Sequence, residues 1–112
     1  MMYYEFPVGD KVYKLRLTTR SMINLEKKIG CNPLAIFGKG DTVPTLTTLL
    51  SVFQYALQPY MSDITENETY KIFDSWIDEG HNLAEFVPVI LEIYKVSGLI
   101  KEEDTTEEQE KN

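Results

Sequence analysis

Cys31 and His81 are the only cysteine and the only histidine in the chain, so a cysteine–histidine site would have to bring these two side chains together. His81 falls between two expected helices, where capping or solvent exposure is the ordinary role of a histidine, and Cys31 is expected to fill the core. Serine and threonine are plentiful, but no nucleophile elbow surrounds any of them. We therefore expect no catalytic residue, and the protein is predicted not to be an enzyme.

Two further patterns suggest ligand binding only weakly. Asp74 and Asp78 stand one helical turn apart, as a metal pair does, but neither a histidine nor a third acid converges with them. A solvated acidic helix face explains them better. The run Gly38-Lys39-Gly40-Asp41 lacks the glycine-rich loop that precedes a helix in nucleotide-binding sites, so an ordinary connector is expected. No metal and no cofactor is predicted.

The charge distribution disfavours a nucleic-acid partner. The formal net charge is −7, and there is no basic stripe to release phosphate counterions. Residues 101–112 carry six acids and no aliphatic or aromatic side chain, so they are predicted to be a disordered acidic tail after a single domain at residues 1–100.

The composition is that of a globular protein, with 43% hydrophobic and 26% charged residues. No run is long enough to span a membrane, and we expect no signal peptide before the first strand. A single cysteine fits a reducing compartment, so a cytoplasmic location is expected.

Residues 2–17 are predicted to form a β-hairpin around Gly9-Asp10, with glycine at the first central position of a type II′ turn. This turn fixes the register, because the numbers of paired residues must then sum to 19. One face should pack on helices and consists of the pairs Phe6–Tyr13, Tyr4–Leu15 and Met2–Leu17. The other face pairs Glu5 with Lys14, and Tyr3 with Arg16 in a cation–π contact.

Capping residues, apolar periodicity and stop residues predict helices after the hairpin. The expected starts are Thr18 or Thr19, Pro44–Thr45, the capping box Thr65–Glu68, and Asn82; the expected stops are Gly30, Gly80 and Gly98. Leu34–Phe37 should form a short helical turn or a packed loop. Pro88 should either kink the last helix or move its start to Glu85–Phe86. The fold class is α+β, mainly α: a hairpin, a bundle of about four helices and the tail.

The second predicted helix has an unusual surface, because no charged residue occurs between Thr42 and Ser62. Two explanations stay open: the helix is central and covered by its own chain, or its polar face contacts a partner or a second copy. The last helix has more apolar surface than one face needs. The candidate partner-contact residues are Thr47, Thr48, Ser51, Gln54, Gln58, Val89, Ile93 and Val96.

The strand ending in KLRLT, followed by a short helix that runs into LEKKIG-x-NPL, resembles the small tail assembly chaperones of long-tailed bacteriophages and prophages of Gram-positive bacteria. The resemblance covers roughly residues 3 to 100. It implies a chaperone that binds the tape measure protein, helps to recruit the tail tube protein, and leaves the finished tail. In many members of that family a ribosomal frameshift near the end of the gene adds a second domain. If this holds here, the chain is the short form and the extension would begin in the tail at 101–112.

Two other classes of function remain as alternatives. The chain could be a structural virion component, such as a head–tail connector or a tail protein, or a small acidic regulator that binds another protein. A helix-turn-helix in the second half of the chain is disfavoured, because acidic residues stand where a recognition helix needs basic ones. Those residues are Asp74, Asp78, Glu79 and Glu85.

Overall fold

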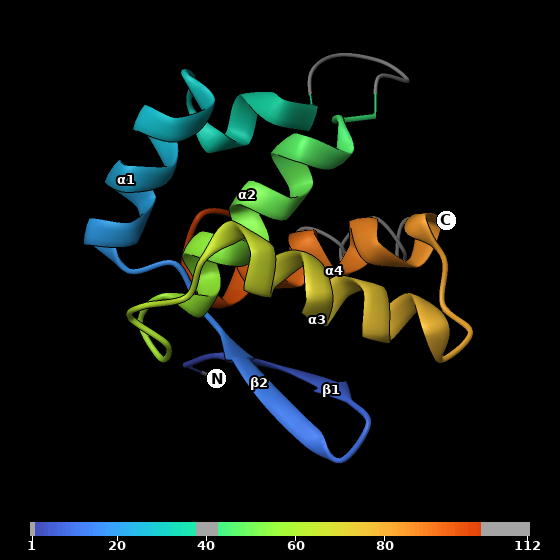
Figure 1. Cartoon of the computed structure of the whole chain (residues 1–112). Helices are drawn as coiled ribbons and strands as arrows, with labels where there is room; N and C mark the ends of the chain where they lie inside the picture. Colours follow the sequence, from blue (N-terminus) through green and yellow to red (C-terminus); the bar gives the residue numbers. More distant parts are fainter. Residues whose placement is uncertain (1, 38–42, 102–112) are drawn as a thin grey trace.

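The computed structural model describes residues 2–37 and 43–101, and these form a β-hairpin beneath a group of helices (Figure 1). In chain order the elements are β1 (Tyr4–Val8), β2 (Lys11–Leu15), α1 (Thr19–Ile29), the 3₁₀ helix η1 (Pro33–Phe37), α2 (Leu46–Leu57), α3 (Glu66–Asp78) and α4 (Leu83–Val96). The predicted α+β class is confirmed. The predicted connector at 38–41 and the acidic tail beyond Lys101 lie outside the described residues.

The hairpin has the predicted register, with Tyr4 opposite Leu15, Glu5 opposite Lys14 and Phe6 opposite Tyr13. Gly9 has a φ of 62°, while Asp10 has no positive φ, which is the pattern of a type II′ turn. Two details of the prediction were wrong. Met2 precedes β1 and is 70% exposed. The charge that lies over the Tyr3 ring belongs to Lys14, 5.0 Å from the ring centroid, because the Arg16 guanidinium donates instead to the carbonyls of Met2 and Val96.

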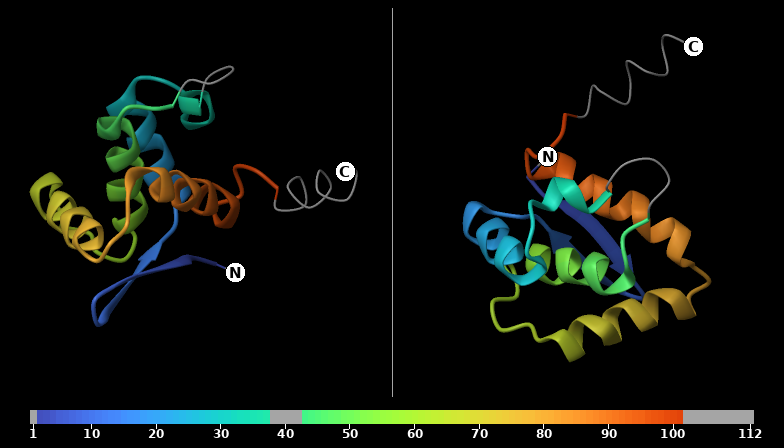
Figure 2. Two further views of the ribbon diagram at one scale, coloured as in Figure 1. Left: turned by 90° about the vertical axis from the view of Figure 1, so that its right-hand side faces the viewer. Right: turned by 90° about the horizontal axis from the view of Figure 1, so that it is seen from above.

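Helix α2 is the centre of the domain. It packs against α1 and α3 along its sides and against α4 and β2 as well, an arrangement visible in both views of Figure 2. Leu49, Val52 and Phe53 are fully buried at this junction. The first of the two explanations for the uncharged helix, a central position, is therefore confirmed. Leu46 at the start of α2 and Tyr60 just after its end are 41% and 40% exposed.

An aromatic cluster ties the hairpin to the helices. Phe86 of α4 is fully buried, and its ring centroid lies 4.8–6.4 Å from those of Phe6, Phe53, Phe73 and Trp76. Most of these pairs meet edge to face, a favourable arrangement for two ring quadrupoles. The cluster joins β1, α2, α3 and α4 in one core.

Helix ends follow the predicted caps. The hydroxyls of Thr18 and Thr65 and the amide oxygen of Asn82 each accept a backbone N–H three residues ahead, in three reciprocal capping boxes. At the end of α4, Gly98 has a φ of 83° and the Leu99 N–H donates to the Tyr94 carbonyl, so the chain closes in a Schellman motif.

Pro88 lies inside α4, which begins at Leu83, so the alternative start at Glu85–Phe86 was wrong. Proline removes the N–H that would bond to the Ala84 carbonyl. Both residues are on the exposed side of the helix, where water can hydrate that carbonyl. Leu83, the first residue of α4, is also exposed, at 42%.

Tyr94 connects α4 to η1. Its side chain is 1% exposed, its hydroxyl donates to the Pro33 carbonyl at 2.7 Å, and burial raises the pKa of the phenol above its usual range. Tyr94→Phe leaves the Pro33 carbonyl without this donor, so we expect a loss of about 1–2 kcal/mol in the free energy of unfolding, measured by urea denaturation. Tyr70→Phe, on the exposed face of α3, is the matched control and should change it by less than about 0.5 kcal/mol. Equal effects would contradict the assigned bond.

Candidate binding surface

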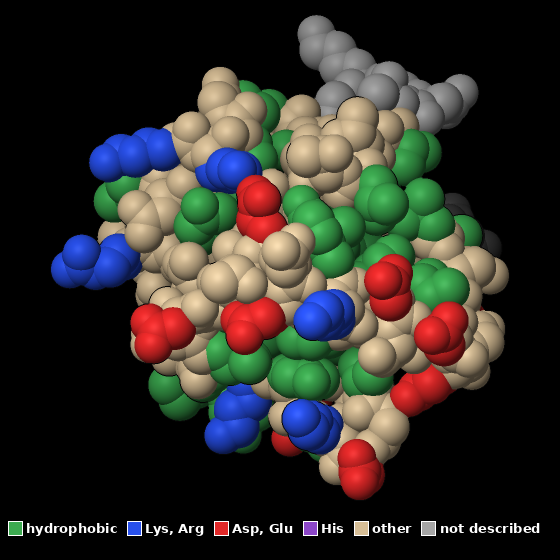
Figure 3. Space-filling view, in the orientation of Figure 1, with side chains coloured by type: hydrophobic (Ala, Val, Ile, Leu, Met, Phe, Trp, Pro, Cys, Tyr) green, Lys and Arg blue, Asp and Glu red, His purple; other side chains and the backbone are tan. Residues whose placement is uncertain are grey.

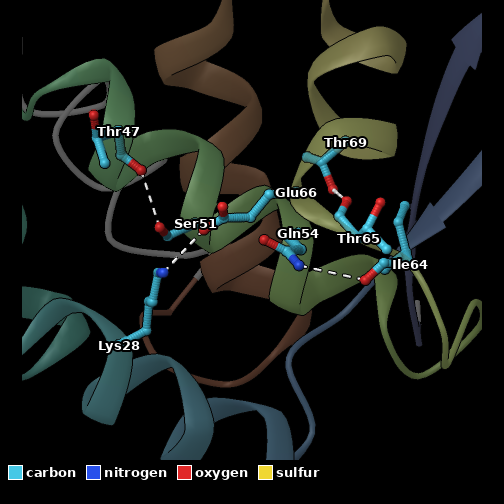
Figure 4. A network of polar contacts seen from close by, with 8 residues as sticks. All are labelled: Lys28, Thr47, Ser51, Gln54, Ile64, Thr65, Glu66 and Thr69. Carbon is cyan, nitrogen blue, oxygen red and sulfur yellow. Dashed lines mark hydrogen bonds and ion pairs between the residues drawn. The ribbon is translucent and has the colours of Figure 1, made fainter.

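The uncharged face of α2 lies between two neighbouring helices, and two of its polar side chains are hydrogen-bonded within the chain (Figure 4). The Ser51 hydroxyl donates to the Thr47 carbonyl at 3.0 Å, and the Gln54 side chain donates to the Ile64 carbonyl at 3.4 Å, in the turn before α3. The flanking helices are joined to each other by an ion pair of 2.9 Å between Lys28 of α1 and Glu66 of α3. The hydrogen bond to Glu66 raises the pKa of Lys28. Charges are absent from this face because the chain itself occupies much of it.

The structure divides the residues predicted to contact a partner. Ser51, Val89 and Ile93 are buried at 7%, 7% and 0% exposure, so they do not form a surface. Their apolar or uncharged character serves the packing of α2 and α4. Thr47 is exposed, and the remaining four are half-buried: Thr48, Gln54, Gln58 and Val96. A role for these in binding remains a prediction.

Cys31 and His81 are not brought together. Cys31 is exposed after the end of α1, so the expectation that it fills the core was wrong. His81 is at the turn between α3 and α4, on the opposite side of the domain (Figure 1). Its ring stacks on Trp76 with a centroid distance of 4.3 Å, and its Nδ1 lies 3.3 Å from the Glu85 carboxylate. His81 thus extends the aromatic core to the surface.

Asp74 and Asp78 are both exposed on α3. Across residues 2–37 and 43–101, no three histidine, cysteine or acidic side chains are grouped so that they could hold a metal ion. Glu79, next to them in sequence, accepts a hydrogen bond from the Gly9 N–H. This carboxylate fixes the hairpin turn to the end of α3, a contact that the sequence did not indicate.

A surface groove runs along the outer side of α1. Two adjoining hollows of about 230 and 440 Å³ share Arg20 and Asn24. We call them together the α1 groove; it is lined by Thr18, Arg20, Ile23, Asn24 and Lys27 on one side, with Gln58, Pro59 and Ser62 beyond α2. It is open and shallow, which suits side chains of a macromolecule better than an enclosed small ligand. Gln58 is the one predicted contact residue that lines it.

The α1 groove has a distinct electrostatic character. Within the described part of the chain, Arg20 and Lys27 have no ion-pair partner, and none of the residues that line the groove is acidic. Figure 3 shows lysine and arginine side chains projecting at the edge of the molecule where α1 lies. Ile23, 47% exposed, adds an apolar contact between the two cations. The groove therefore suits a segment with both apolar and acidic side chains.

The sequence contains a signal for this groove. Arg20, Asn24 and Lys27 recur at steps of four and three, so they share one stripe of α1, and Leu25 lies on the opposite stripe. Ile23 falls on the polar side of the helix, where an aliphatic residue gains nothing from the core. Single exposed aliphatic residues are common on protein surfaces, so the signal lies in the basic stripe around Ile23 rather than in Ile23 alone.

The comparison with known families gives one result. The model of a family of unknown function, DUF6096, matches residues 5–111. The chain belongs to this family. The range matched by DUF6096 contains α1 to α4 and every residue of the α1 groove. The comparisons with curated proteins and with solved structures found no match. No helix in the described residues is long and apolar enough to cross a membrane.

Proposed function

We propose that this protein is a non-enzymatic tail assembly chaperone of a bacteriophage or prophage, which binds the tape measure protein and assists assembly of the tail tube in the host cytoplasm. The proposal starts from the resemblance carried by residues 14–18 and 25–34. The observation that supports it best is the α1 groove, because most of its lining comes from α1, the helix that connects these two segments.

The chemistry of the groove fits a helical client. A tape measure protein of this kind is expected to be long and largely helical, and an amphipathic helix can bind by laying its apolar stripe in a groove. In the α1 groove Ile23 would contact the apolar stripe, while Arg20 and Lys27 would pair with acidic side chains beside it. Asn24 and Gln58 add uncharged hydrogen-bonding groups.

Co-expression with the tape measure protein from the same genome tests the proposal. We expect the client to become soluble and to co-purify with the intact chain, and a chain truncated after Ile100 to retain binding. Arg20→Gln/Lys27→Gln should lower the amount of client recovered about fivefold, since each exposed ion pair contributes a factor of roughly 1.5 to 5. The matched control is Lys11→Gln/Lys71→Gln, which removes the same charge from exposed positions away from the groove and should leave recovery unchanged.

Two outcomes would contradict the proposal. The chaperone function would be excluded if the client stays insoluble and does not co-purify with the chain. Circular dichroism must show that the chain itself is folded in that experiment. Stoichiometric amounts of the chain in purified phage particles would instead identify a structural virion component, since a chaperone leaves the finished tail.

A further inference from the structure

The end of α4 lies beside the start of α1. The Leu17 N–H donates to the Ser97 hydroxyl at 2.8 Å, and the Arg16 guanidinium contacts the Val96 carbonyl at 3.3 Å. Leu99 and Ile100 are half-buried against the core. The chain therefore reaches Lys101 from a fixed position close to the first turn of α1 (Figure 2).

The residues that follow are opposite in charge to the α1 groove. Residues 102–112 contain six acids and one lysine, a net charge of −5. The groove contributes Arg20 and Lys27 and has no acidic residue in its lining. The acidic residues Asp63 and Glu68 line a separate hollow on the other side of Ser62.

The length of this segment is sufficient. Eleven extended residues span up to about 36 Å. Helix α1 has 11 residues and is therefore only about 16 Å long. Even a path around the helix leaves enough chain to place several carboxylates between Arg20 and Lys27.

We propose that the acidic segment 102–112 binds in the α1 groove of its own chain. The segment is tethered next to the groove, which gives it an effective concentration in the millimolar range. A weak electrostatic contact is then populated in the intact chain, although the same peptide added in solution at micromolar concentration would bind little. The bound segment competes with any acidic partner for Arg20 and Lys27. This contact does not depend on the identity of the client.

Cys31 provides a direct test, because it is the only cysteine, is exposed, and follows the end of α1. A nitroxide label on Cys31 should broaden the amide NMR signals of residues 102–112 in the full chain, relative to the reduced label. The broadening should fall about fivefold in Arg20→Gln/Lys27→Gln and should persist in the Lys11→Gln/Lys71→Gln control. It should also fall in 1 M salt, where the Debye length is about 3 Å.

A second variant separates charge from chain length. Replacing the six acids of the segment by glutamine or asparagine keeps its length. The broadening of its amide signals should then fall to the level seen in Arg20→Gln/Lys27→Gln. Broadening that is absent from the full chain, or that is the same in the groove variant and in its control, would overturn the proposal. A mixed sample of spin-labelled chain and isotope-labelled chain should show none. Broadening there would assign the contact to a second copy and would also overturn it.

Discussion

Phe86→Ala is expected to lower the free energy of unfolding by about 3–5 kcal/mol, the range for removing a fully buried phenylalanine from a core. Phe86 is 0% exposed and packs against Phe6, Phe53, Phe73 and Trp76. These rings come from β1, α2 and α3, so the cavity would open where these three elements meet α4. A domain of this size has a total stability of about 5–15 kcal/mol. The variant would therefore be close to unfolding.

Urea denaturation measures this loss, and Trp76 is a suitable probe because it is the only tryptophan and is 5% exposed. Phe37→Ala is the matched control. Phe37 is half-buried in η1, and its one aromatic neighbour is Tyr94, so its removal should cost less than half as much. A cost for Phe86→Ala that is no larger than that of the control would contradict the central role of this ring.

Local structure could be predicted from the sequence because it depends on neighbouring residues. The turn at Gly9-Asp10 determined the register of the hairpin, since a two-residue loop leaves no freedom in pairing. The capping box Thr65–Glu68 and the cap residue Asn82 identified the starts of α3 and α4 through the orphan N–H groups of a first turn. These features need no knowledge of tertiary packing.

Several of the errors concern contacts between elements distant in sequence. The apolar excess of α4 left open whether Val89 and Ile93 face a partner, and only packing in the interior shows that the domain itself covers them. Periodicity identifies an apolar face but not its neighbour. The exposure of Cys31 was missed for the same reason, since a small residue after a helix stop carries no pattern. The α1 groove depends on Pro59 and Ser62, which lie 30 and 33 positions after the end of α1.

Leu25→Ala should destabilise the protein by about 2–5 kcal/mol, whereas Ile23→Ala should change its stability by less than about 0.5 kcal/mol. The two aliphatic residues are on opposite faces of α1. Leu25 is 0% exposed and anchors the helix in the core, while Ile23 is 47% exposed in the α1 groove. Urea denaturation of both variants checks this difference, and each serves as the control for the other.

The same pair of variants separates folding from binding. Because Ile23→Ala keeps α1 in place and removes an apolar contact from the groove, it should lower recovery of the co-expressed tape measure protein with no loss of stability. Leu25→Ala should lower recovery only as far as it unfolds the chain, so a temperature at which it remains folded should restore binding. If Ile23→Ala leaves recovery unchanged, the exposed face of α1 is not where the client binds. If a folded Leu25→Ala chain fails to bind, binding of the client depends on the position of α1 rather than on its outer side chains.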